Sequence, residues 1–184
     1  MSICLSCLKQ VARCFVNDIP ICNDCYAESV QLLVIYDTNR KPEDSRVIQI
    51  DKHLYISDQD AARNLDHLKK EGIKKILIAG SYLQPWFLND FDYKQLAWED
   101  SLKQKILPDL DEALRFLQNT KQKTLVHCAQ GISRSGSLIV AYLMKKHSIS
   151  YDEALQMARS KSPRICPNPS FETQLRSWEK TIRS

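Results

Sequence analysis

Short apolar runs recur along most of this chain, separated by segments in which apolar residues repeat at helical spacing. The runs at residues 47–50, 53–57, 74–80 and 124–128 predict strands, and residues 92–98 predict a weaker one. Two of them, KKILIAG at 74–80 and TLVHC at 124–128, are almost continuously apolar. Such runs are typical of parallel strands that are buried on both faces.

Helices are predicted between and after these strands. They are residues 60–71, a stripe formed by Ile106, Leu107, Leu110, Ala113, Leu114 and Leu117, residues 135–146, a segment opened by Ser150 and Glu153, and a last helix from about Ser170. Gly72 is expected to close the first helix, and Ser150 with Glu153 forms a capping box. Strands that alternate with helices predict an α/β fold whose sheet is covered by helices on both faces.

The first part of the chain does not follow this pattern. Residues 1–36 are dense in cysteine, residues 37–45 are polar and contain Pro42, and the α/β pattern begins at about residue 46. A polar segment with proline between two unlike regions is typical of a linker. We therefore predict a small module at 1–36, a linker at 37–45 and one larger domain at 46–184.

Composition and charge narrow the class of protein. The chain has 184 residues, 43% of them hydrophobic, and a formal net charge of +4 without a long Lys/Arg run, so nucleic acid is not an expected partner. No apolar run approaches the roughly 20 residues that span a membrane, and the N-terminus lacks the apolar core of a signal peptide. Seven cysteines without such a signal indicate an intracellular, reducing location, cytoplasmic or nuclear.

Two CxxC pairs in the N-terminal module predict a metal site. The pairs are Cys4 with Cys7 and Cys22 with Cys25, and the segment between them is expected to form a hairpin. Two such pairs supply four thiolates to one tetrahedral Zn²⁺, which has no open position and is therefore structural. Iron is a less favoured metal for this site. The alternative without a metal is that reduced thiols are clustered here by chance. So short a module needs a staple of this kind to fold.

The stretch TLVHCAQGISRSGS, residues 124–137, runs from a strand through a tight loop into a helix. A helix N-terminus offers unpaired backbone N–H groups and the positive end of a dipole, so it stabilises an anion. Gly131 and Gly136 permit the tight backbone, and Arg134 can grip two oxygens of a phosphate. A thiol in these surroundings, here Cys128, ionises easily and becomes a nucleophile. Without the other, Cys128 would be interpreted as an ordinary core cysteine and Arg134 as a surface arginine.

This stretch resembles the His-Cys-x5-Arg-Ser/Thr signature of the protein tyrosine phosphatase superfamily. The segments YISDQDAARN, YKQLAWED, AYLMKK and ICPNPSFETQLRSWE resemble its dual-specificity branch and occur in the expected order, so the resemblance spans about Val47 to Glu179. It implies the cysteine phosphatase fold: a central, mostly parallel sheet with helices on both sides and the signature loop at the carboxyl end of a strand. No kinase-docking module is recognisable, which favours the atypical group of this branch.

The resemblance also implies roles for residues of the loop. Cys128 resembles the nucleophile that forms a cysteinyl-phosphate, and Ser135 the hydroxyl that helps the thiol leave. His127 resembles the histidine that braces the loop. The phosphate-binding set that the resemblance implies is Arg134 and the backbone amides of Ala129, Gln130, Gly131, Ile132, Ser133 and Arg134.

The family's general acid is an Asp on a loop, which matches Asp100 at the end of YKQLAWED. Neighbouring Glu99 is the alternative acid if the register differs by one. The non-catalytic alternative is that Asp100 is only a loop or helix-capping carboxylate. Ala97 and Trp98 depart from the family's usual residues, so the conformation of this loop is open. No metal is expected to take part in catalysis.

The side chains of the loop indicate the substrate class. Ala129, Gln130 and Ile132 are uncharged, where phosphoinositide phosphatases of this superfamily usually carry lysine. No insert resembles the tyrosine-recognition loop of the large classical enzymes, so a shallow pocket open to phosphoserine, phosphothreonine and phosphotyrosine is expected. The resemblance thus implies phosphoprotein substrates, with RNA 5′ ends or phosphoglucan as less favoured ones.

Two readings of function remain open from the sequence. The leading one is a dual-specificity protein phosphatase whose zinc module serves stability or docking to a protein partner. The other is a catalytically weak pseudo-phosphatase that binds phosphosites or acts as a scaffold. Cys166 resembles a family position close to the signature loop. The favoured interpretation is an ordinary loop cysteine, and a disulfide with Cys128 under oxidation is the less favoured one.

Overall fold

The computed structural model describes residues 14–16, 19–21, 45–118 and 121–182 of the chain. One five-stranded sheet forms the centre, in the order β3-β4-β7-β5-β6. Its strands are β3 (Ile48–Asp51), β4 (Leu54–Ser57), β5 (Ile73–Ala79), β6 (Asp92–Leu96) and β7 (Lys123–His127). Only β3 is antiparallel to its neighbour, so the sheet is mostly parallel, as predicted.

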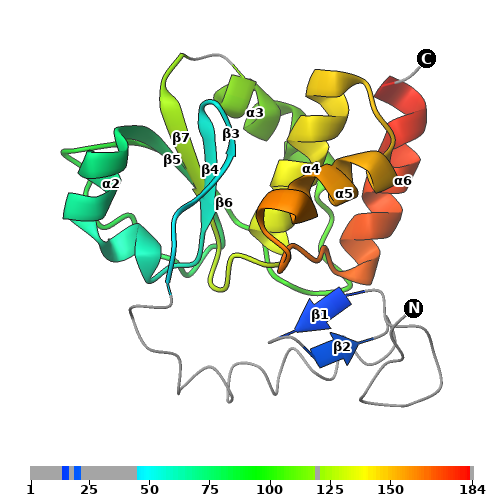
Figure 1. Ribbon diagram of the computed structural model, residues 1–184. Coiled ribbons are helices and arrows are strands. Elements are labelled where there is room, and N and C mark those ends of the chain that lie inside the picture. Colours follow the sequence, from blue (N-terminus) through cyan, green and yellow to red (C-terminus); the bar gives the residue numbers. More distant parts are fainter. Residues whose placement is uncertain (1–13, 17–18, 22–44, 119–120, 183–184) are drawn as a thin grey trace.

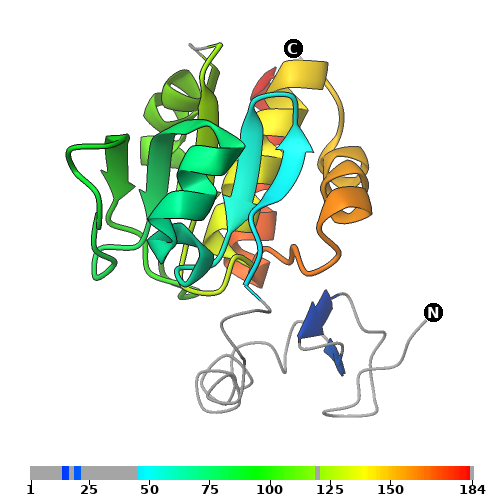
Figure 2. The same cartoon turned by 60° about the vertical axis from the view of Figure 1, so that its left-hand side comes forward.

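Helices cover both faces of this sheet (Figures 1 and 2). They are the 3-10 turn η3 (Ala61–Arg63), α2 (Leu65–Glu71), α3 (Leu107–Gln118), α4 (Arg134–His147), α5 (Tyr151–Lys161) and α6 (Pro169–Ile182). Helix α2 lies on one face, and α3, α4, α5 and α6 lie on the other. The predicted α/β fold with helices on both faces is therefore confirmed.

The two faces of the sheet bury two apolar clusters. The larger one joins β4, β5 and β7 to the four helices α3 to α6, with Val126 and Leu77 on the sheet side. The smaller one joins the other face to α2, with Leu68 and Leu125 among its members. Successive residues of a strand point to opposite faces, so neighbours Leu125 and Val126 enter different clusters. This explains why the predicted strands at β5 and β7 are nearly continuous apolar runs.

Helix α4 is the most buried helix on the larger face. All of its residues from Arg134 to Met144 are buried, and only the last three, Lys145, Lys146 and His147, are exposed. Gly136 allows this packing, because a Cβ at that position would lie 3.0 Å from Cγ2 of Ile165. The helix is thus fixed along its length, and its N-terminus stays aligned with the end of β7.

Local side-chain bonding sets the ends of several elements. The capping box of Ser150 and Glu153 is present at α5, and Gly72 ends α2 in the left-handed conformation at φ 75°. One prediction is wrong: residues 60–71 do not form a single helix. Asn64 takes an extended conformation and its side chain accepts a hydrogen bond from the backbone N–H of His67, so η3 ends and α2 begins there.

In the N-terminal part, two short antiparallel strands, β1 (Cys14–Val16) and β2 (Ile19–Ile21), form the hairpin that was expected between the CxxC pairs. Cys4, Cys7, Cys22 and Cys25 lie outside the described residues, as does the predicted linker up to residue 44. Over the ranges that are described, no helix is long and apolar enough to cross a membrane.

Candidate active site

The loops that follow the parallel strands meet at one edge of the sheet. Residues 128–133 follow β7, the loop from Gly80 follows β5, and the loop from Ala97 follows β6. Because β5, β6 and β7 run parallel, these three loops leave the sheet at the same end. Ligands of open α/β sheets bind at this end.

Cys128 lies at the bottom of the signature loop, where it is 1% exposed. The backbone N–H of Gly131 donates to Sγ of Cys128 at 3.3 Å, and Oγ of Ser135 lies 3.2 Å from the same sulfur. Gly131 has φ 69°, and a Cβ there would lie 2.8 Å from the carbonyl oxygen of Ser57. The loop therefore requires glycine at this turn, and the backbone amide of Gly131 faces the sulfur. Hydrogen bonds of this kind stabilise a thiolate.

Arg134 is the charged partner of this sulfur. Its Nη2 donates to the hydroxyl of Tyr82 at 2.8 Å, and its Nη1 donates to the carbonyl of Trp98 at 3.5 Å. Burial opposes the charged guanidinium, but Cys128, Tyr82 and Asp100 outweigh that effect and raise the pKa of Arg134. Nε is buried and, within the described part of the chain, has no hydrogen-bond partner. An oxyanion above the sulfur would satisfy this donor.

Asp100 is held at the rim of the same pocket. Its Oδ1 accepts hydrogen bonds from Oγ of Ser133 at 2.8 Å and from Nδ2 of Asn168 at 2.9 Å, and its Oδ2 lies 3.8 Å from Nε of Arg134. Glu99 also lines the pocket, but it is its backbone N–H that donates a hydrogen bond, to Oε1 of Gln104 at 2.9 Å. The geometry therefore favours Asp100 over Glu99 as the residue fixed towards the loop.

Trp98 anchors the loop that carries Asp100. Its ring is fully buried and packs at 5.9 Å from the ring of Phe171, and its Nε1 donates to Oδ2 of Asp109 at 2.8 Å. This indole therefore ties the loop after β6 to α3 and α6. Trp98, which departs from the family's usual residue, therefore holds this loop in one conformation.

His127 supports the loop from below. It is buried at the end of β7, and its Nδ1 lies 3.4 Å from the carbonyl oxygen of Cys128. Burial lowers the pKa of His127 to about 4, and the charge of Arg134 adds to that effect while the carbonyl of Cys128 opposes it. The imidazole is therefore neutral near neutral pH, which suits a support and does not suit a proton carrier.

These residues enclose one pocket of about 310 Å³. Its lining residues are Tyr82, Glu99, Asp100, Cys128, Ala129, Gln130, Ile132, Ser133 and Arg134. The structure thus brings together Cys128, Arg134, Asp100 and most of the predicted phosphate-binding loop. Gly131 donates from the loop itself, and Ser135 lies behind the sulfur in α4.

Sequence reasoning missed Tyr82 and Asn168. Tyr82 lies just after β5, far from the signature in sequence, and its side chain is 60% exposed at the mouth of the pocket. In the sequence, Asn168 stands between Pro167 and Pro169, and no local pattern links it to Asp100. Its side chain bridges Asp100 and the backbone N–H of Phe171 in α6. Cys166 is buried next to the loop, where its N–H donates to the carbonyl of Ile132 at 3.1 Å.

Comparisons with known proteins show which family the chain resembles. Residues 54–181 match the family model described as dual specificity phosphatase, catalytic domain. The chain is 36% identical to dual specificity protein phosphatase 1B of Arabidopsis thaliana over 73% of this chain and 83% of that protein. It is 33% identical to dual specificity protein phosphatase 19 of Mus musculus over 74% of this chain and 63% of that protein.

Two solved structures show the same fold. A mouse putative dual specificity phosphatase complexed with zinc tungstate superposes with a TM-score of 0.71 and 25% identity, over 74% of this chain and 88% of that one. The human tyrosine phosphatase-like serine/threonine/tyrosine-interacting protein gives a TM-score of 0.71 and 26% identity, over 75% and 98%. With the family match over 54–181, these likenesses cover all the loops around the pocket, and the chain belongs to the dual-specificity protein phosphatase family of enzymes.

Proposed function

We propose that this protein hydrolyses phosphotyrosine and phosphoserine or phosphothreonine in proteins through a cysteinyl-phosphate intermediate. The observation that carries the proposal is the buried sulfur of Cys128 beneath the pocket, with the buried Nε of Arg134 lacking a hydrogen-bond partner among the described residues. A phosphoryl group in this position would accept bonds from Arg134 and the loop amides. A mouse relative in this family was crystallised with tungstate, a tetrahedral oxyanion, which agrees with this use of the pocket.

In the first step, the Cys128 thiolate attacks phosphorus, and the bond from phosphorus to the substrate oxygen breaks. Asp100 gives its proton to the leaving oxygen, because an alkoxide or phenolate leaves poorly without one. The amides of residues 129–134 and the guanidinium of Arg134 stabilise the charge on the transferring group.

In the second step, water attacks the cysteinyl-phosphate, and Asp100 takes a proton from that water. The phosphorus–sulfur bond breaks, so inorganic phosphate and the thiolate are released. The hydroxyl of Ser135, 3.2 Å from the sulfur, donates a hydrogen bond to the thiolate as it leaves. Each proton that Asp100 gives in the first step is therefore recovered in the second.

The pocket fits proteins better than highly charged lipid head groups. The side chains that the loop presents to it, Ala129, Gln130 and Ile132, are uncharged. Tyr82 adds an aromatic wall at the mouth. A phosphotyrosine ring can pack against this wall, and the exposed position of Tyr82 leaves room for the shorter phosphoserine and phosphothreonine.

Leaving-group dependence tests this mechanism. Cys128→Ser is expected to abolish turnover of an aryl phosphate, and Asp100→Asn to lower kcat by about 10²–10⁴ for substrates with poor leaving groups. The same variant should affect a nitrophenyl phosphate much less, because that leaving group needs little protonation. Glu99→Gln is the matched control and should stay close to wild type. A larger loss in Glu99→Gln would assign the acid to the neighbouring position.

The competing proposal is a pseudo-phosphatase that binds phosphosites without turning them over. The name of the human structural relative, a tyrosine phosphatase-like serine/threonine/tyrosine-interacting protein, supports this proposal. An intact wild type that binds a phosphopeptide but releases no phosphate would establish it. Release that depends on Cys128 would exclude it.

We further propose that Cys4, Cys7, Cys22 and Cys25 hold one structural Zn²⁺ in a module that serves stability or docking to a protein partner. The chemistry of four thiolates in two CxxC pairs fits a closed tetrahedral site. The hairpin β1–β2 between the pairs agrees with a compact module. Metal analysis of the purified chain should find one zinc per chain, and Cys4→Ser should lose it. Protein purified without metal, at full thiol content, would contradict this proposal.

A further inference from the structure

Exposed apolar side chains lie in the loops beside the pocket. Among the described residues, the large apolar side chains that are exposed are Tyr82, Trp86, Leu88, Leu102 and Met157. The first three belong to the loop between β5 and β6, and Leu102 lies in the loop that carries Asp100. Tyr82 also lines the pocket over Cys128. Apolar side chains exposed next to a binding pocket are typical of an interaction surface.

The loop between β5 and β6 is fixed by residues other than Trp86. The side-chain amide of Gln95 donates to the carbonyl of Gly80 at 2.7 Å, where the loop begins. Further along, the backbone N–H of Phe87 donates to the hydroxyl of Tyr93 at 3.3 Å. These bonds do not involve the indole, which is 48% exposed. The fold therefore does not explain why a tryptophan stands at position 86.

One face of the Trp86 ring is covered by Arg63. The guanidinium carbon of Arg63 lies 4.5 Å from the ring centroid. Nη1 of the same side chain lies 3.9 Å from Oδ1 of Asp60, so a carboxylate offsets its charge. The half-exposed ring has its other face open to solvent, beside a pair of charges that cancel. Such a face suits an uncharged, apolar group better than an ion.

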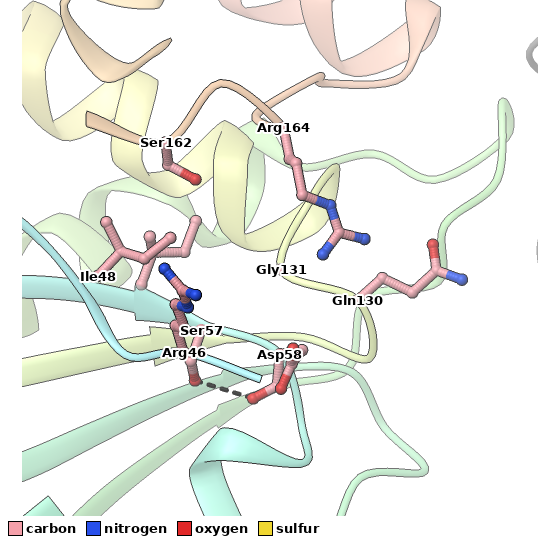
Figure 3. Close-up of a pocket in the computed structure, with 9 residues that line it drawn as sticks. Arg46, Ile48, Ser57, Asp58, Gln130, Gly131, Ser162 and Arg164 are labelled. Carbon is pink, nitrogen blue, oxygen red and sulfur yellow. Dashed lines mark hydrogen bonds between the residues drawn. The ribbon is translucent and has the colours of Figure 1, made fainter. Parts of the chain in front are cut away.

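Arg63 holds the indole near the signature loop. It belongs to η3, which follows β4, and the segment between them lies against that loop. The backbone N–H of Gln59 donates to the carbonyl of Ala129 at 3.1 Å, and Figure 3 shows Asp58 close to Gly131. The ring that packs on Arg63 is therefore at the same edge of the sheet as the pocket.

From this arrangement we infer that Trp86, next to Tyr82, forms a subsite for an apolar side chain of the substrate protein, close in sequence to the phosphoresidue held over Cys128. The inference rests on the proposed function. The occupant is the substrate because Tyr82 belongs both to this loop and to the pocket. Residues 82 and 86 are at most about 14 Å apart along the chain, a distance that about four residues of an extended peptide also span. Tryptophan is among the residues that contribute most to protein binding.

Phosphotyrosine peptides with one varied position test this inference on the full chain. The varied residue is alanine, leucine, glutamate or lysine, placed in turn at each of the four positions on either side of the phosphotyrosine. We expect kcat/KM to rise about three- to tenfold for leucine over alanine at one register, because apolar surface leaves water. Glutamate and lysine should give no such gain. The inference is overturned by a gain for either charged residue equal to that for leucine, or by no gain for leucine at any register.

Variants of Trp86 locate the effect. Trp86→Ala should remove the gain for leucine and Trp86→Phe should keep part of it, while turnover of a small aryl phosphate stays as in wild type, because Trp86 does not line the pocket. Met157→Ala is the matched control, since it removes another exposed apolar side chain, in α5. A gain that persists in Trp86→Ala overturns the inference. A wild type that fails on the aryl phosphate overturns the proposed function instead.

Tryptophan emission gives a second readout that does not depend on turnover. The other two tryptophans are Trp98, which is fully buried, and Trp178, which is partly buried. Saturating the Cys128→Ser chain with the leucine peptide should shift the emission to shorter wavelength, and the alanine peptide should shift it less. Adding Trp86→Phe to that chain should abolish the shift. No shift with the leucine peptide, or the same shift without Trp86, also overturns the inference.

Discussion

At the scale of single residues, the pocket depends on contacts between residues far apart in sequence. Tyr82 is the clearest case, because its hydroxyl accepts a hydrogen bond from Arg134 at 2.8 Å and its ring lies 5.3 Å from the guanidinium. This bond orients the guanidinium before phosphate arrives. Orientation in advance lowers the cost of binding.

Tyr82→Phe keeps the ring and removes only the hydroxyl. We expect inorganic phosphate to inhibit this variant about three- to tenfold more weakly than wild type, which corresponds to the loss of one hydrogen bond of a charged group. Tyr82→Ala should in addition lower the preference for phosphotyrosine over phosphothreonine peptides, because the wall is gone. Tyr142→Phe, which removes a hydroxyl bonded to Asp51 away from the pocket, is the control. Unchanged inhibition in Tyr82→Phe would show that Arg134 needs no such support.

His127 makes stability depend on pH. Its pKa is lowered from 6.5 to about 4 in the folded chain, so the unfolded chain takes up a proton first as the pH falls. The free energy of unfolding should therefore fall between about pH 6.5 and pH 4, by about 3 kcal/mol in total from this one group. Above pH 6.5 His127 should contribute no pH dependence.

Urea unfolding of wild type and His127→Gln between pH 7 and pH 4.5 measures this effect. The difference between the two chains should shrink as the pH falls, because only the wild type loses stability through the histidine. Carboxylates titrate in both chains, so the comparison cancels their contribution. A difference that stays constant with pH would contradict a neutral buried imidazole.

At the scale of elements, the turn between β7 and α4 sets the position of the sulfur and the amides. Glycine is required at position 131 for two reasons. Its φ is 69°, and a Cβ would lie only 2.8 Å from the carbonyl oxygen of Ser57. The start of α4 and the end of β4 therefore fix the loop from both sides. A change in this turn should affect chemistry more than folding.

Gly131→Ala should lower kcat/KM by 100-fold or more and the free energy of unfolding by about 1–3 kcal/mol. Gly72→Ala is the matched control: its φ is 75°, but a Cβ there would meet only Cδ of Lys123, at 3.7 Å, far along the chain from the loop. That variant should pay a similar conformational cost and keep its activity. Equal activity losses in both would mean that general destabilisation, rather than the turn, is responsible.

At the scale of the whole molecule, the residues proposed to act in catalysis are held by contacts within the α/β domain. Cys128, Arg134 and Asp100 bond to residues from Tyr82 to Asn168. The cysteines proposed to bind zinc precede this domain in sequence. Catalysis and metal binding should therefore be separable.

Dialysis of the full chain against a chelator should remove the zinc, lower the thermal midpoint and leave kcat for an aryl phosphate unchanged within about twofold. The double variant Cys4→Ser with Cys22→Ser should behave in the same way without a chelator. Zinc content, thermal unfolding and initial rates measured on the same samples check this. A kcat that falls in proportion to the zinc lost would mean that the module supports the pocket directly.

Local chemistry explains where the sequence-based predictions held and where one was wrong. The capping box at Ser150 and the glycine end at Gly72 were predicted because their signals lie within a few residues of one another. The break at Asn64 was missed, because apolar spacing runs through it while its side chain captures the N–H of His67. Asn is a favoured N-cap residue, but the prediction of one helix over residues 60–71 followed the apolar spacing instead.

The sequence by itself determined the α/β class, the strands buried on both faces and the loop that presents Cys128 and Arg134, because spacing, glycine positions and a helix start are local properties. Only the tertiary structure decided which distant residues complete the pocket. Tyr82 reaches Arg134, and Trp98 reaches Asp109 in α3, because the parallel strands β5, β6 and β7 bring the loops that follow them to one edge of the sheet. Asn168 reaches Asp100 from the segment just before α6, so the packing of α6 sets its position.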